Sequence, residues 1–166
     1  MEFINDDEFL DIVGRILTNE EFCKLKSIEH HGITRFDHSL KVSYYAFKIS
    51  KILKLDYEDT ARGALLHDFF LSNEGETFKD KFVSTFTHPK KAVIQTKKIF
   101  NISAKEENII HSHMFPTYCA LPKFAESFVV IGVDKIVGSF EFFKKFSYKL
   151  SYAANIYLLF LFNIRK

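Results

Sequence analysis

The feature that most constrains this chain is its scarcity of residues that interrupt helices. Its 166 residues include only three prolines and six glycines, and no internal repeat or low-complexity linker divides them. Apolar residues recur at three- and four-residue steps along most of the sequence, as they do on the buried face of a helix. No segment shows the alternation that is typical of a strand. The sequence therefore predicts an all-α fold of seven or eight helices.

Length and composition favour a single domain. A chain of this size can bury one hydrophobic core but hardly two, and 47% of its residues are hydrophobic. We expect one domain over 1–166, with a core at about 30–140 and a C-terminal helix, 141–166, packed on it. The last helix is also a candidate homodimer contact, although core packing is the interpretation that we favour.

Local signals place the boundaries of the expected helices. Ser103 and Glu106 form a capping box, which begins a helix, and this helix must end before Pro116. Pro89 fits the first turn of a helix, where its missing N–H costs little. The polar stretch 71–80, which contains Gly75, indicates a loop. The expected helices cover 6–17, 37–55, 58–69, 88–100, a segment after Ser103, 123–145 and the end of the chain.

Charge and cysteine content exclude several classes of protein. The formal net charge is only +2, which argues against a dedicated nucleic-acid binder. Cys23 and Cys119 are too few for a disulfide framework, so we expect free thiols in a reducing cytoplasm. The acidic start lacks the positive charge of an export signal. The apolar run 156–164 is shorter than the roughly 20 residues of a membrane-spanning helix.

Histidine and aspartate side chains lie where an apolar helix gives them little reason to be. His67 and Asp68 follow one another in "GALLHDFF", and Asp134 lies in the apolar stretch "VVIGVDKIVGSF". His38 comes near the start of the long helix 37–55. Each has a simpler interpretation, because His38 could be a capping or core residue and Asp134 could form a salt bridge. Together, neutral nitrogen and anionic oxygen ligands suit a divalent metal ion.

The order of these residues resembles that of the HD-domain metal-dependent phosphohydrolase superfamily. The resemblance covers about residues 30–140 and includes "RFDHSLKVS" around His38 and "ALLHD" around the pair. It implies an all-α bundle in which His38, His67, Asp68 and Asp134 hold a first metal ion. Further histidines between the pair and Asp134 resemble the dinuclear branch, and His88 matches the first additional position.

The second additional position falls on His111 or His113. His113 follows Ile109 and Ile110 by four and three residues, which places it on the apolar face of the helix, and the family's Ile-x-x-His pattern also ends there. His111 follows Glu107 by four residues, on the polar side. We favour His113 as the ligand and His111 as a residue of the second shell, the pocket wall or the surface.

The resemblance implies two divalent ions, with Fe, Mn, Co, Ni, Zn or Mg as candidates. Asp68 would bridge them, and a shared water would ionise to a hydroxide that attacks phosphorus. Arg35 and Lys135 are candidate cations for the phosphate, although both could be ordinary surface charges. We expect hydrolysis of a small phosphate ester or anhydride, with a nucleotide as the favoured substrate. The alternatives are a diiron oxygenase and a non-catalytic nucleotide-binding module.

Overall fold

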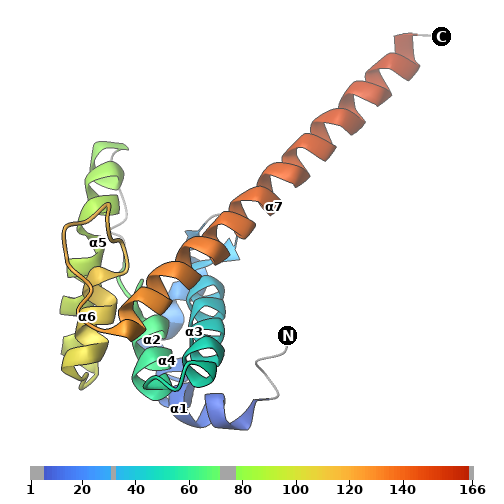
Figure 1. Ribbon diagram of the computed structural model, residues 1–166. Coiled ribbons are helices and arrows are strands. Elements are labelled where there is room, and N and C mark those ends of the chain that lie inside the picture. Colours follow the sequence, from blue (N-terminus) through green and yellow to red (C-terminus); the bar gives the residue numbers. More distant parts are fainter. Residues whose placement is uncertain (1–5, 31–32, 72–77, 165–166) are drawn as a thin grey trace.

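The computed structural model describes residues 6–30, 33–71 and 78–164, with side chains described over 6–28, 33–71 and 87–149 (Figure 1). Helices dominate these residues, which confirms the predicted all-α fold. The seven α-helices of the described chain are α1 (Asp7–Leu17), α2 (Glu20–Cys23), α3 (Arg35–Ile52), α4 (Tyr57–Leu66), α5 (Phe78–Ile99), α6 (Ala104–Ser112) and α7 (Ala125–Ile164).

A short irregular stretch joins α2 to α3. It contains the 3-10 turn η2 (Lys24–Ser27) and two antiparallel strands of two residues each, β1 (Glu29–His30) and β2 (Ile33–Thr34). No strand is predicted from the sequence, because two residues are too few to show an alternating pattern. Thr34 then caps α3, since its hydroxyl accepts a hydrogen bond from the Asp37 backbone N–H at 3.0 Å.

Side-chain caps begin the helices that carry the site. Asp56 accepts from the backbone N–H of Asp59 at the start of α4. At α6, Ser103 accepts from the backbone N–H of Glu106, whose carboxylate accepts from the backbone N–H of Ser103. This reciprocal pair confirms the predicted capping box. The helix ends at Ser112, before Pro116, as expected.

Helix α5 begins earlier than the sequence analysis expects. It starts at Phe78, so the end of the predicted loop 71–80 is helical, and residues 72–77 lie outside the described residues. Pro89 consequently lies inside the helix, and the expectation that it occupies the first turn is wrong. Proline lacks the N–H for one helical hydrogen bond, but its fixed φ of about −65° is compatible with helix.

Helix α7 replaces two expected helices. It runs from Ala125 to Ile164 without interruption, because no proline or glycine follows residue 145 to end it. Figure 1 shows the later part of α7 extending beyond the other helices. Side chains from residue 150 onward lie outside the described residues. The expected packing of 141–166 on the core therefore stays a prediction over most of that range.

The core lies around the α3–α4 pair. On one side, fully buried aromatic rings, including Phe9, Phe22, Phe47 and Phe69, pack together. On the other side, a smaller cluster of valine, alanine and isoleucine side chains joins α3 and α4 to α6 and α7; it comprises Val42, Ala46, Ala64, Ile109, Val130, Val133 and Val137.

Gly63 allows α4 to approach α6 closely. A Cβ atom at this position would lie 3.0 Å from Cγ2 of Ile109, which is closer than ordinary van der Waals contact. The close approach brings the C-terminal ends of α4 and α6 together, and His67 and His113 follow directly at those two ends.

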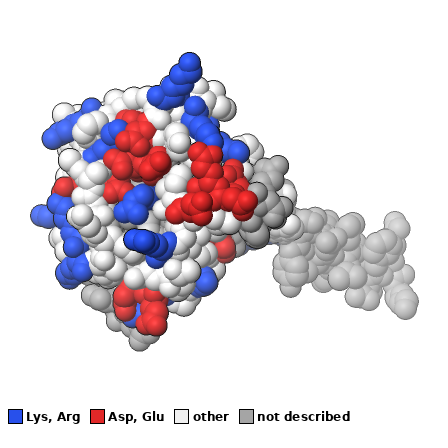
Figure 2. All heavy atoms as spheres, turned by 90° about the horizontal axis from the view of Figure 1, so that it is seen from below, with Lys and Arg blue, Asp and Glu red and all other residues white. Residues whose placement is uncertain are grey.

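The surface mixes both signs of charge. Figure 2 shows basic and acidic side chains interspersed over one face of the molecule. A search of the described part of the chain finds no helix with the length and apolar character needed to cross a membrane. Cys23 and Cys119 are both free thiols.

Candidate metal centre

All six predicted metal ligands line one cavity of about 630 Å³. They come from five parts of the fold, so tertiary packing rather than local sequence brings them together. His38 lies in the first turns of α3 and Asp134 lies in α7, whereas His88 lies within α5. His67 is the C-cap of α4, Asp68 follows it, and His113 is the C-cap of α6.

Three of these side chains form the inner triad, which consists of His38, His67 and Asp134. One Asp134 carboxylate oxygen, Oδ1, lies 3.0 Å from His38 Nε2 and 3.6 Å from His67 Nε2. Both imidazoles are about 1% exposed. One atom from each of the three residues falls within 4.8 Å of the others, so a single ion could contact all three.

The other three side chains form the outer group, which consists of Asp68, His88 and His113. Asp68 Oδ1 lies 3.3 Å from His88 Nε2 and 3.7 Å from His113 Nε2, and the two histidine nitrogens lie 2.8 Å apart. Asp68 Oδ2 also lies 3.9 Å from His67 Nε2. Asp68 therefore directs one carboxylate oxygen toward His88 and His113 of the outer group and the other toward His67 of the inner triad.

Hydrogen bonds at the opposite ring nitrogens orient the histidines. Nδ1–H of His67 donates to the Ala64 carbonyl at 2.7 Å, and Nδ1–H of His113 donates to the Ile110 carbonyl at 2.8 Å. Nδ1 is therefore the donor in each ring, and Nε2 is the nitrogen that a metal ion would contact. Each Nε2 faces the carboxylates, which is the arrangement that a metal ligand requires.

Burial and charge act in opposite directions on these histidines. Burial lowers the pKa of His113 to about 3, and the neighbouring His67 contributes to the shift. For His38, burial also lowers the pKa, but hydrogen bonds to Asp134 and Glu141 outweigh it and raise the pKa to about 10. Burial raises the pKa of Asp134, but its hydrogen bonds to His38 and His67 outweigh this and hold it well below its usual range. The centre thus combines an anionic oxygen with neutral nitrogen at His113.

Glu141 is a residue of this site that the sequence analysis misses. Its Oε2 lies 2.8 Å from His38 Nδ1, and its Oε1 accepts from Lys41 Nζ at 2.9 Å. A signal for it exists in the sequence, because Glu141 follows Asp134 by seven residues. Seven residues are close to two helical turns, so both carboxylates belong to the same side of α7.

The two cations predicted to bind phosphate occupy different surroundings. Lys135 lines the cavity, and its Nζ donates to the Phe115 carbonyl at 2.7 Å. Arg35 is not among the described residues that line the cavity. Its Nη1 donates to the Phe70 carbonyl at 2.6 Å, and its guanidinium lies over the Phe70 ring. That ring stacks on His88, at 5.3 Å between centroids.

The structure also separates the two candidate histidines of α6. His113 is buried and lines the cavity. His111 is not among the described lining residues, and its ring contacts Tyr118 edge-on instead. Apart from Lys135, the rest of the cavity wall consists of two phenylalanines, a methionine and two small residues; they are Phe142, Phe143, Met114, Gly138 and Ser139.

Comparison with known proteins identifies the family. An uncharacterized protein of Methanocaldococcus jannaschii, MJ1154, is 37% identical in an alignment of 76 residues, which covers 39% of this chain and 17% of that protein. No solved structure matches. The model of the HD domain family matches residues 35–136, which is more than half of the chain and includes all six residues of the inner triad and outer group. The chain therefore belongs to the HD domain family.

Proposed function

We propose that this protein is a phosphohydrolase that uses two divalent ions to cleave a phosphate ester or anhydride of a small molecule. HD-domain proteins are generally metal-dependent hydrolases. The observation that carries the proposal is that Asp68 Oδ1 lies near His88 and His113, while Asp68 Oδ2 lies 3.9 Å from His67 of the inner triad. Two ions would need one such set each and a carboxylate between them.

The six residues of the inner triad and the outer group would bind and orient the ions. The inner triad would hold one ion and the outer group the other, with Asp68 facing both. Bound divalent ions of this kind lower the pKa of water and neutralise charge on phosphate oxygens. The candidates stay Fe, Mn, Co, Ni, Zn and Mg, because imidazole and carboxylate ligands accept all of them.

We propose a nucleotide as the substrate because part of the cavity wall is aromatic. Phe142 and Phe143 line it, and aromatic rings of this kind stack on a nucleobase. Lys135, at the same cavity, would contact a phosphate oxygen. Arg35 would act indirectly, because its contact with Phe70 supports the ring on which His88 stacks.

A metal-supplemented hydrolysis assay tests the proposal. The purified protein is loaded with manganese, cobalt or iron, and phosphate release is measured over a panel of nucleotides. We expect release that disappears in Asp68→Asn. Two iron ions per chain without phosphate release would favour the diiron oxygenase. A nucleotide that raises the melting temperature without being cleaved would favour the binding module. Either result would contradict the proposed hydrolysis.

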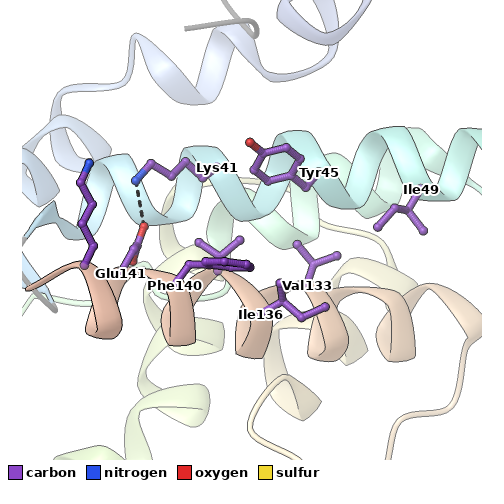
Figure 3. Close-up of a pocket in the computed structure, with 9 residues that line it drawn as sticks. Lys41, Tyr45, Ile49, Val133, Ile136, Phe140 and Glu141 are labelled. Atoms are coloured by element: carbon purple, nitrogen blue, oxygen red, sulfur yellow. Dashed lines mark hydrogen bonds and ion pairs between the residues drawn. The ribbon is translucent and has the colours of Figure 1, made fainter. Parts of the chain in front are cut away.

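We also propose that a second copy of the chain covers an apolar surface on α3 and α7. The exposed side chains of this surface are Tyr45, Ile49, Ile52, Leu53, Ile136 and Phe140. The α3 members recur at helical spacing. Tyr45, Ile49, Ile136 and Phe140 line a groove of about 540 Å³. Figure 3 shows how these four side chains lie between the two helices. Large apolar side chains that are exposed next to one another, rather than scattered singly, mark interaction surfaces.

The same surface carries both a projecting ring and a hollow. Phe140 is 73% exposed beside the groove, so two copies related by a twofold axis could each receive the other's ring. Sedimentation of the wild type should give a dimer, and Phe140→Asp should shift it toward monomer. Leu121→Asp, which changes an exposed residue elsewhere, is the control. A wild type that stays monomeric at high concentration would contradict the dimer.

A further inference from the structure

We infer that Glu141 is a positioning residue of the metal centre, holding the His38 ring so that its Nε2 faces the inner ion. The inference rests on the proposed metal centre and adds a residue to it. The contact of Glu141 with the metal centre is made through His38 Nδ1. Glu141 lies in α7, whereas His38 lies in α3.

His38 differs from the other two buried histidines in what holds its Nδ1. His67 and His113 each donate Nδ1–H to a backbone carbonyl three residues earlier, within their own helix. His38 instead faces a side chain from another helix, with Glu141 Oε2 at 2.8 Å. The direction of the His38 ring therefore depends on α7. A charged acceptor at Nδ1 also makes Nε2 a stronger ligand than a neutral carbonyl does.

Lys41 completes the contact. Its Nζ donates to Glu141 Oε1 at 2.9 Å, while the other carboxylate oxygen is left for His38. Figure 3 shows this ion pair joining α3 to α7 at one end of the apolar groove. Glu141 itself is only 7% exposed. A carboxylate this buried needs charged or hydrogen-bonding partners, and Lys41 and His38 supply them.

α7 thus supplies both partners of the His38 ring. Asp134 Oδ1 lies 3.0 Å from Nε2, and Glu141 Oε2 lies at Nδ1 on the opposite side. A bound ion would take the place between Nε2 and Asp134, and the Glu141 contact would remain. Loss of Glu141 should therefore weaken the inner ion while leaving its three ligands in the chain.

Metal affinity of the full chain tests this role. Manganese binding is measured by competition with a chelating dye for wild type, Glu141→Ala, Glu141→Gln and Lys41→Met. We expect Glu141→Ala to weaken the inner ion about 10- to 100-fold, the range found for such supporting carboxylates. Glu141→Gln should lose less, because its amide oxygen can accept from Nδ1–H. Lys41→Met should lose least.

Glu126→Ala is the matched control. Glu126 is also buried, at 6% exposed, and also accepts from a lysine, Lys105 at 3.1 Å, but no described histidine contacts it. It should lower stability without changing manganese affinity. Affinity of Glu141→Ala equal to wild type overturns the inference. If Glu141→Ala does not fold, Glu141→Met, which also removes the acceptor but keeps more of the side-chain volume, takes its place with the same criterion. If the wild type itself binds no manganese, zinc or iron, the proposed centre fails instead.

Discussion

The inner triad and the outer group contain the same kinds of ligand but are supported differently. The inner triad is built on α3, α4 and α7, which pack around the buried clusters of the core. The outer group depends on α5 for His88, whose ring stacks on Phe70. Exposure does not separate the two sets, because the side chain of Asp134 is 16% exposed and that of His88 is 12% exposed. The sets differ in the helices that support them, so we expect loss of His88 to affect the outer ion alone.

Replacement of Asp68 should have the largest effect, because this residue faces both the inner triad and the outer group. Because its two oxygens face ligands of both sets, Asp68→Ala should lower metal content at both and reduce phosphate release by about 10³-fold or more, the equivalent of several kcal/mol of charge stabilisation. Metal per chain and hydrolysis rate are measured together. Asp11→Ala, an exposed aspartate of α1, is the control. Full metal content in Asp68→Ala would exclude the shared position.

Replacement of His88 tests the outer group separately, because this residue has no counterpart in the inner triad. His88→Ala should reduce bound metal from two ions per chain to one, since the inner triad is left intact. Mass spectrometry of metal content after gel filtration checks the number. His111→Ala is the control, because His111 contacts Tyr118 rather than the cavity, and it should keep both ions. Two ions retained in His88→Ala would show that α5 supplies no ligand.

Gly63 tests the packing that brings the two sets together. In Gly63→Ala the new methyl group would meet Ile109 at 3.0 Å, so α4 and α6 would have to separate slightly. Overpacking of this kind costs about 1–3 kcal/mol, measured as the free energy of unfolding in urea. Gly14→Ala, with no atom within 4 Å, should instead stabilise by up to about 1 kcal/mol. Equal effects of both changes would contradict the close contact.

The smallest expected effect is a pH dependence of stability that comes from the network of Asp56, Lys105 and Glu126, which lies away from both sets of ligands. Burial raises the pKa values of Asp56 and Glu126, but hydrogen bonds, including those from Lys105, outweigh it and lower both. The folded pKa values therefore lie below the unfolded ones, so the network stabilises the fold above roughly pH 4. This stabilisation is lost as the pH falls through the folded pKa values, and it amounts to at most about 1 kcal/mol.

Urea unfolding of the metal-free protein between pH 6 and pH 3 measures the contribution of this network to the free energy of unfolding. Wild type should lose more stability than Lys105→Met over that range, because the variant has already lost the pair. The network joins the start of α4 to the start of α7, and α7 carries Asp134. Parallel curves for the two proteins would show that Lys105 contributes nothing there.

Much of the fold was predictable because its signals are local. The helical spacing of apolar residues and the Ser103–Glu106 capping box each depend on a few neighbouring residues. Pro89 misled the prediction of α5, because proline is far less costly at the first turn of a helix than inside one, and here it lies inside. The extent of α7 was also missed, since its sequence contains no stop signal and the boundary expected near 145 had no residue to mark it.

The candidate ligands were predictable through a resemblance rather than through geometry. His38 and Asp134 are 96 residues apart, and only the packed helices bring them within 3.0 Å. Glu141 was missed because its role depends on the His38 ring, which lies on another helix. The surroundings of Arg35 were likewise missed, since its contact with Phe70 spans 35 residues.

A crystal structure of the protein soaked with manganese tests the central claim most directly. Anomalous scattering should give two peaks about 3.5–4 Å apart, one among His38, His67 and Asp134 and the other among Asp68, His88 and His113. A single peak would contradict the paired centre. Peaks outside the cavity would contradict the claim that these six side chains bind the metal.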